Sequence, residues 1–223
     1  MAMFKEGRAG MRIHITTHTT KKGSNLNKMD GIQSVSTSVK LNPICKFRAQ
    51  CGNSVCAHCY ASKLVGYRKT LAKCLEVNHE ILNNHLLSEA EAMQVEFTTA
   101  LGRIEAFGDV ASVTCARNYI RIIRANPETK FGIWTKNCGI WLAAFHKEGK
   151  PDNTTFVVSS PRLNEPMEIS ESIRPYVDHV FTVWDKEHYT FGNTETECAG
   201  LCCRKCRKCY RKETSFYINE KLR

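Results

Sequence analysis

The sequence has no long apolar run and no secretory signal. No part of its 223 residues approaches the roughly 18 consecutive apolar residues that a membrane helix needs. The N-terminal segment MAMFKEGRAGMRIH lacks the continuous apolar core of a signal peptide. We therefore expect a cytoplasmic protein that does not associate with membranes and whose cysteines are reduced.

Two common nucleotide-binding signatures are also missing. The chain contains neither a Walker-type phosphate loop nor the glycine fingerprint of dinucleotide-binding folds. It has no internal repeat and no low-complexity segment, so the sequence does not require a boundary between two domains. At this length one α/β domain with a substantial core is the natural expectation.

Cysteine, in contrast, is abundant and clustered. Nine of the twelve cysteines lie in two runs, Cys45-x5-Cys51-x4-Cys56-x2-Cys59-Tyr60 and Cys198-x3-Cys202-Cys203-x2-Cys206-x2-Cys209-Tyr210. In a reducing compartment, clustered thiolates indicate zinc or an iron–sulfur cluster rather than disulfides. The candidate ligands are Cys45, Cys51, Cys56, Cys59, Cys198, Cys203, Cys206 and Cys209, and Cys202 is an alternative to Cys198 in the second set.

The remaining candidate ligands have simpler explanations. Cys74, Cys115 and Cys138 fall in or at the start of expected helices, where cysteine usually behaves as a small buried hydrophobic residue. His58 lies inside the first run and could replace a thiolate, but a histidine facing solvent is the simpler interpretation.

The positive charge is concentrated at the two ends of the chain. The net charge is +10, and residues 1–50 carry nine Lys/Arg against two Asp/Glu, while residues 202–223 carry eight against two. The middle of the chain is slightly acidic. Such basic ends can attract nucleic acid or a nucleotide. The alternative is a solvated surface that also offsets the negative charge of thiolate-bound clusters.

A regular alternation of apolar runs and helical stretches predicts a parallel sheet. A first strand is expected within residues 30–41, followed by RIEAF, KFGIWT, TTFVVSS and HVFTVW. Helices are expected near 110–125, 138–148 and 166–175. Five βα units are too few for a closed eight-fold barrel. A partial (βα) barrel and an open doubly wound sheet both fit.

The pattern also divides the chain into three segments. These are a basic arm at 1–29, an α/β domain at 30–190 that contains the cysteine loop 45–59, and a cysteine-rich basic segment at 191–223. One long amphipathic helix is expected from residue 61 to 87, a second from about Glu89 to Leu101 capped by Ser88, and a short one at 213–222.

Polar residues follow several of the expected strands. Because active sites of parallel α/β folds form at the C-terminal ends of strands, these loops and the first cysteine run are expected on one face. The loop residues that make up this candidate pocket are Gly108, Asp109, Thr135, Lys136 and Ser159.

These motifs resemble those of a known family. A strand, then Cys51-x4-Cys56-x2-Cys59-Tyr60, then a long helix resembles the cluster loop of radical S-adenosylmethionine enzymes, which usually show C-x3-C-x2-C. The stretch RIEAFGDV at 103–110 resembles their second-strand motif. The order VSTSVKLNP, CAHCYASK, RIEAFGD and FGIWTKN resembles the phage-encoded gene product 88 family over roughly residues 30–210.

The resemblance implies a specific chemistry in the cytoplasm of an infected bacterium. Cys51, Cys56 and Cys59 would hold a [4Fe–4S] cluster whose open iron chelates S-adenosylmethionine beside Gly108 and Asp109, and the resulting radical would act on an unknown substrate. The first spacer is one residue longer than usual, and Cys45 could close the open iron.

Two further hypotheses stay open. One is a non-catalytic [4Fe–4S] protein for electron transfer, sensing or assembly. The other is a zinc-bound nucleic-acid-binding module in which both runs are structural. The spacing of Cys203, Cys206 and Cys209 is like that of bacterial ferredoxins, and it also suits a zinc knuckle.

Overall fold

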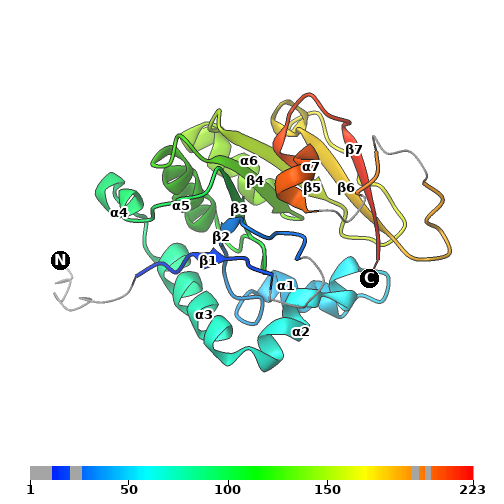
Figure 1. Cartoon of the computed structure of the whole chain (residues 1–223), viewed down its shortest axis with the longest axis horizontal. Helices are drawn as coiled ribbons and strands as arrows, with labels where there is room; N and C mark the ends of the chain where they lie inside the picture. Colours follow the sequence, from blue (N-terminus) through cyan, green and yellow to red (C-terminus); the bar gives the residue numbers. More distant parts are fainter. Residues whose placement is uncertain (1–11, 21–26, 192–195, 199–201, 223) are drawn as a thin grey trace.

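A computed structural model describes residues 12–20, 27–191, 196–198 and 202–222 (Figure 1). It is built on one seven-stranded sheet whose strands follow chain order from β1 to β7. The β1 strand pairs antiparallel with β2, and every later pair is parallel. The strands are β1 (Thr16–Thr17), β2 (Gln33–Val35), β3 (Leu101–Ile104), β4 (Lys130–Thr135), β5 (Thr154–Ser159), β6 (His179–Trp184) and β7 (Tyr217–Lys221).

The strand order never reverses, so the α/β class is confirmed but a doubly wound sheet is not formed. The helices are α1 (Pro43–Ala49), α2 (Tyr60–Tyr67), α3 (Lys69–Asn84), α4 (Glu89–Met93), α5 (Val113–Arg124), α6 (Cys138–Glu148) and α7 (Cys203–Cys206), with 3-10 turns η1 (Val55–His58), η2 (Arg174–Tyr176) and η3 (Lys208–Tyr210). None of the helices in the described ranges is long and apolar enough to cross a bilayer.

The two faces of the sheet are covered differently. On β4, Phe131 and Ile133 join the main core with Tyr119 of α5 and Trp141 of α6. The alternate residue Trp134 belongs to smaller apolar clusters that contain cysteines of both runs. Figure 1 shows α7 lying over the strands on the side away from α5 and α6. The cysteines of both runs therefore lie on the side of the sheet that faces away from α5 and α6.

The two ends of the strand order approach one another. Lys28, which precedes β2, donates a hydrogen bond to Glu220 of β7 and forms an ion pair with it. The backbone N–H of Cys203 also donates to the carbonyl of Lys28 at 2.7 Å. The sheet takes strands from all three segments expected from the sequence, because β1 lies within 1–29 and β7 within 191–223.

Several element boundaries match the sequence patterns. The run KFGIWT is β4, HVFTVW is β6, and α5 and α6 lie where helices were expected. Ser88 caps α4 through a reciprocal capping box with Glu91, as predicted. The helix itself ends at Met93, and Leu101 begins β3 instead.

Other expectations were wrong. The long helix after Tyr60 is broken at Arg68, whose ψ of 79° is not helical. The strand expected within residues 30–41 is present as β2, but it is only three residues long. Residues 166–175 contain no α-helix, and the turn η2 begins only at Arg174. The segment 213–222 forms β7 rather than a helix, because parallel pairing with β6 satisfies its backbone. The expected arm contributes β1, and its residues 1–11 and 21–26 lie outside the described residues.

Candidate metal and cofactor site

The first cysteine run spans the C-terminal ends of several strands. Asn42 begins α1 by accepting hydrogen bonds from the backbone N–H groups of Ile44 and Cys45, and its amide donates to the carbonyl of Asp109 at 2.7 Å. Farther along, Ser54 and Val55 donate to the carbonyl of Pro161, which follows β5. The run is thus fixed between the ends of β2, β3 and β5.

Three thiols of this run are neighbours. Burial raises the pKa of Cys45, and the charges of Asp109, Glu105, Cys56 and Cys59 raise it further. The Sγ of Cys51 lies 3.7 Å from the carbonyl oxygen of Phe47. His58 is exposed. Cys45 and Cys59 also pack in the same apolar cluster, so the structure brings Cys45 near Cys56 and Cys59.

A buried carboxyl, Glu105, lies just past the end of β3. Its carboxylate accepts hydrogen bonds from the backbone N–H of Thr37 at 3.0 Å, the Thr37 hydroxyl at 2.6 Å and the Tyr119 hydroxyl at 2.7 Å. Burial raises the pKa of Glu105 to about 7, although these three hydrogen bonds oppose the shift. A Cβ at Gly108 would lie 2.7 Å from the carbonyl oxygen of Thr37 and 2.9 Å from Oε2 of Glu105. Glycine is therefore needed where these two loops meet.

Asp109 joins β3 to β4 through a buried hydrogen-bond network. Its carboxylate accepts from the Thr135 hydroxyl at 2.7 Å and from the backbone N–H of Lys136 at 2.8 Å, and Arg48 of α1 lies 3.6 Å away. Burial raises the pKa of Asp109 despite the nearby Lys136 and Arg48 charges. Four of the five predicted pocket residues thus form one group. Ser159 is buried at the end of β5, and its hydroxyl makes no hydrogen bond to a described residue.

Four thiols of the second run are also neighbours. Burial raises the pKa of Cys209, and the charges of Cys198, Cys203 and Cys206 add to the shift. Cys202 points elsewhere, with its Sγ 4.0 Å from the carbonyl oxygen of Asp30. The structure therefore groups Cys203, not Cys202, with the other three thiols.

Arg103 of β3 lies on the sheet face that carries both runs. Its guanidinium carbon sits 3.7 Å from the centroid of the Trp134 ring. The same positive charge opposes the raised pKa values of Cys203 and Cys209. Its Nε is buried and has no hydrogen-bond partner among the described residues. A partly buried guanidinium beside these thiols, with one N–H unpartnered among the described residues, suits a site that would carry negative charge with a metal bound.

All twelve cysteines are free thiols. Within the described residues, no three Cys, His, Asp or Glu side chains are close enough to form a ready-made metal site. The thiols are neighbours within electrostatic range, and the chemistry of the donor set fits a thiolate-bound metal. Binding would draw them together from these positions.

Sequence reasoning missed two residues of this region. Glu105 lies inside the motif RIEAFGDV, but only the glycine and the acid at its end were assigned a role. A lone charged residue between two apolar ones in an expected strand was the available signal. Arg103 is the other charged residue of this expected strand, and in the structure its charge acts on Cys209.

Comparison with protein families places the chain. The family model for gene product 88 matches residues 10–213, which include both cysteine runs and β1 through β6. The chain belongs to the gene product 88 family. No curated protein and no solved structure matched it. For this member of a phage gene-product family, the site must therefore be interpreted from its own residues.

Proposed function

We propose that this gene product 88 protein is an iron–sulfur protein with a radical-SAM-like partial barrel. The observation that carries the proposal is the presence of two clusters of cysteine thiols on the side of a sequentially ordered parallel sheet that faces away from α5 and α6. The contact between Lys28 and Glu220 supports curvature of the sheet toward a partial barrel, since it joins the two ends of the strand order. The substrate is not identified by any of these residues.

The residues present fit two [4Fe–4S] clusters. Cys45, Cys56 and Cys59, with Cys51 close in sequence, would hold one at the C-terminal ends of the strands. Cys198, Cys203, Cys206 and Cys209 would hold the other, and Arg103 would offset part of its negative charge. When bound with one iron open, the first cluster would supply the electron for cleaving S-adenosylmethionine.

The surrounding residues have roles that follow from their contacts. Gly108 provides the close approach of the two loops, and Asp109 holds Thr135 and Lys136 at the end of β4. Ser159 adds an unpartnered hydroxyl at the end of β5. Glu105, with a pKa near 7, can hold or release a proton beside Cys45. These are the groups that would position a cofactor and exclude water.

The position of Cys45 favours a second candidate function. Because Cys45 lies with Cys56 and Cys59, four thiols are available to the first cluster. A cluster with four thiolates has no open iron, which would make the protein an electron carrier, sensor or assembly factor rather than an enzyme.

The test is metal and sulfide analysis, with absorption spectra, on protein purified without oxygen. Wild type should be brown, with about eight irons and similar sulfide per chain. Cys203→Ala should lose about half of the iron, whereas the matched neighbour Cys202→Ala should keep it. In the first run, retention of iron by Cys45→Ala would support the open cluster, and its loss would support the closed one.

A colourless protein with one or two bound zinc ions would contradict the proposal. It would leave the zinc-bound nucleic-acid module as the interpretation of both runs. Equal iron loss in Cys202→Ala and Cys203→Ala would contradict the ligand set assigned to the second run.

A further inference from the structure

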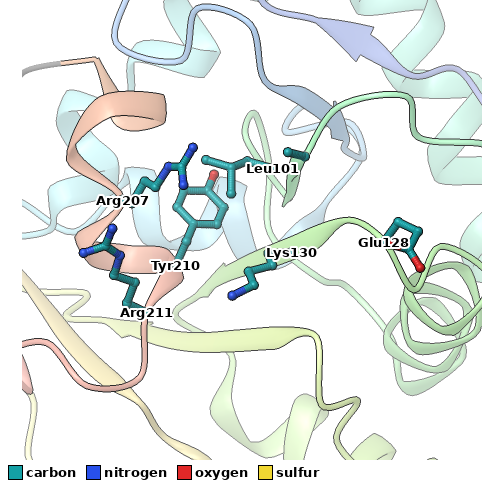
Figure 2. Close-up of a pocket in the computed structure, with 7 residues that line it drawn as sticks. Leu101, Glu128, Lys130, Arg207, Tyr210 and Arg211 are labelled. Carbon is teal, nitrogen blue, oxygen red and sulfur yellow. The ribbon is translucent and has the colours of Figure 1, made fainter.

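A small pocket lies at the opposite edge of the sheet from the first cysteine run. Its volume is about 190 Å³, and it opens where β3 and β4 begin. The C-terminal segment forms its other wall. Figure 2 shows the main lining residues, which are Leu101, Glu128, Lys130, Arg207, Tyr210 and Arg211.

Three cations around this pocket have no acidic partner. Lys130, Arg207 and Arg211 are exposed, and none of them forms an ion pair with a described residue. Arg207 uses only its Nε internally, donating to the carbonyl of Arg204 at 3.0 Å. Glu128 is the one acidic side chain of the lining, and Figure 2 shows it at the far end from the two arginines.

Tyr210 provides a polar group of a different kind. Its side chain is buried against Gly132 and Trp134, so its position is fixed. Its hydroxyl makes no hydrogen bond to a described residue, and the residue lines the pocket. A fixed phenol donor among three unpaired cations suits an anion with several acceptor oxygens, such as a phosphate group.

Further cations continue along the same edge. Arg204 lies beside the chain that leads into β2, where it forms an exposed ion pair with Asp30 at 3.9 Å. Lys212 donates to the carbonyl of Asp152 at 3.3 Å, just ahead of β5. Because β2 to β5 are parallel, these positions and the pocket lie along one edge of the sheet. A row of cations favours a ligand with several phosphates in line over a single phosphate.

We propose that this edge binds the backbone of a single-stranded nucleic acid, with one phosphate in the pocket between Lys130, Arg207, Tyr210 and Arg211. The inference uses no thiol and concerns the edge of the sheet away from the first cysteine run. One wall of the pocket, Arg207 and Tyr210, is adjacent in sequence to Cys206 and Cys209 of the proposed second cluster.

The test is binding of a labelled single-stranded oligonucleotide by the full chain over a salt series. The magnitude of the slope of log K against log salt should fall by about 0.7 in Lys130→Gln/Arg211→Gln, because the one phosphate held in the pocket contributes about that much on a single strand. The matched control is Lys69→Gln/Lys73→Gln, which removes two exposed cations from α3 and should leave the slope unchanged. Tyr210→Phe should weaken binding about tenfold by removing one charge-assisted hydrogen bond.

Three outcomes would overturn the proposal. They are absence of oligonucleotide binding, equal loss in the two double variants, and binding of inorganic phosphate that the oligonucleotide does not displace. The last outcome would assign the pocket to a small phosphate compound. Iron content measured on the same preparations separates this test from that of the clusters, since Lys130→Gln/Arg211→Gln should keep wild-type iron.

Discussion

At the scale of single residues, Glu105 connects the loop after β2 to helix α5. The hydroxyls of Thr37 and Tyr119 both donate to its Oε1, and its backbone takes a φ of 57° that L-residues rarely adopt. Such a conformation costs about 1–2 kcal/mol and persists only where the surroundings enforce it. The three hydrogen bonds provide that enforcement, so Glu105 is a fixed part of the candidate site.

The raised pKa of Glu105 predicts a pH dependence of stability. Its folded pKa of about 7 lies above the ordinary 4.5, so folding favours the neutral acid. The stabilising contribution is complete below about pH 4.5 and is lost as the pH rises through about 7. Between about pH 5 and pH 8, wild type should lose on the order of 2–3 kcal/mol more than Glu105→Gln, measured by urea unfolding. Parallel pH profiles for the two proteins would show that Glu105 is ionised in the fold.

Residue-level predictions from sequence were accurate where the chain order itself determines proximity. Asp109, Thr135 and Lys136 were expected together because each follows a parallel strand, and they share one hydrogen-bond network. The closeness of Cys45 to Cys56 and Cys59 could not be predicted from spacing alone. It depends on the orientation of α1, which Asn42 and Arg48 fix through contacts distant in sequence.

At the scale of elements, η3 packs closely on the sheet because Gly132 of β4 has no side chain. A Cβ at Gly132 of β4 would overlap the Trp134 ring and lie 3.1 Å from Cε1 of Tyr210. Gly132→Ala should therefore destabilise the fold by about 1–3 kcal/mol, the usual effect of overpacking. It should also make the segment 202–210 more susceptible to proteolysis, because η3 must move away from β4. Thermal unfolding and limited proteolysis with mass spectrometry measure the two effects.

The matched control is Gly139→Ala in α6. Nothing lies within 4 Å of a Cβ at that position, so alanine should be neutral or stabilising by up to about 1 kcal/mol. If both variants had the same thermal stability and cleavage pattern, close packing of η3 on Gly132 would be excluded.

Element-level predictions succeeded where local pattern and tertiary packing agree. The strands β4 and β6 and helix α6 are strongly apolar and lie in the middle of the sheet or directly on it. The helix predicted at 213–222 was wrong because these residues carry little periodicity, and pairing with β6 makes part of the segment a strand. The prediction of one unbroken helix through Arg68 was wrong for a different reason. The apolar spacing continues through it, while the chain turns between α2 and α3.

At the scale of the whole molecule, the two faces of the sheet depend on different forces. The main core joins β3 to β6 with α3, α5 and α6 and contains no cysteine of either run. The other face is covered by residues of α2 and α3 and by the short elements α7 and η3, which have four and three residues. Helices of this length do not form without outside contacts. Their order must come from packing on the sheet and, in the proposed function, from bound metal.

If both runs bind metal as proposed, this division of the molecule predicts the effect of removing it. Chelation should loosen residues 45–60 and 202–222 locally. The main core should stay folded, because it contains no cysteine of either run and so does not depend on metal binding. Hydrogen exchange with mass spectrometry, before and after chelation, should show faster exchange in these two segments and unchanged protection in α5, β4 and β5. Reconstitution with iron and sulfide should restore slow exchange in residues 45–60 and 202–222. Uniform loss of protection across the chain would mean instead that metal is needed for the whole fold, as in small zinc domains whose binding energy is their folding energy.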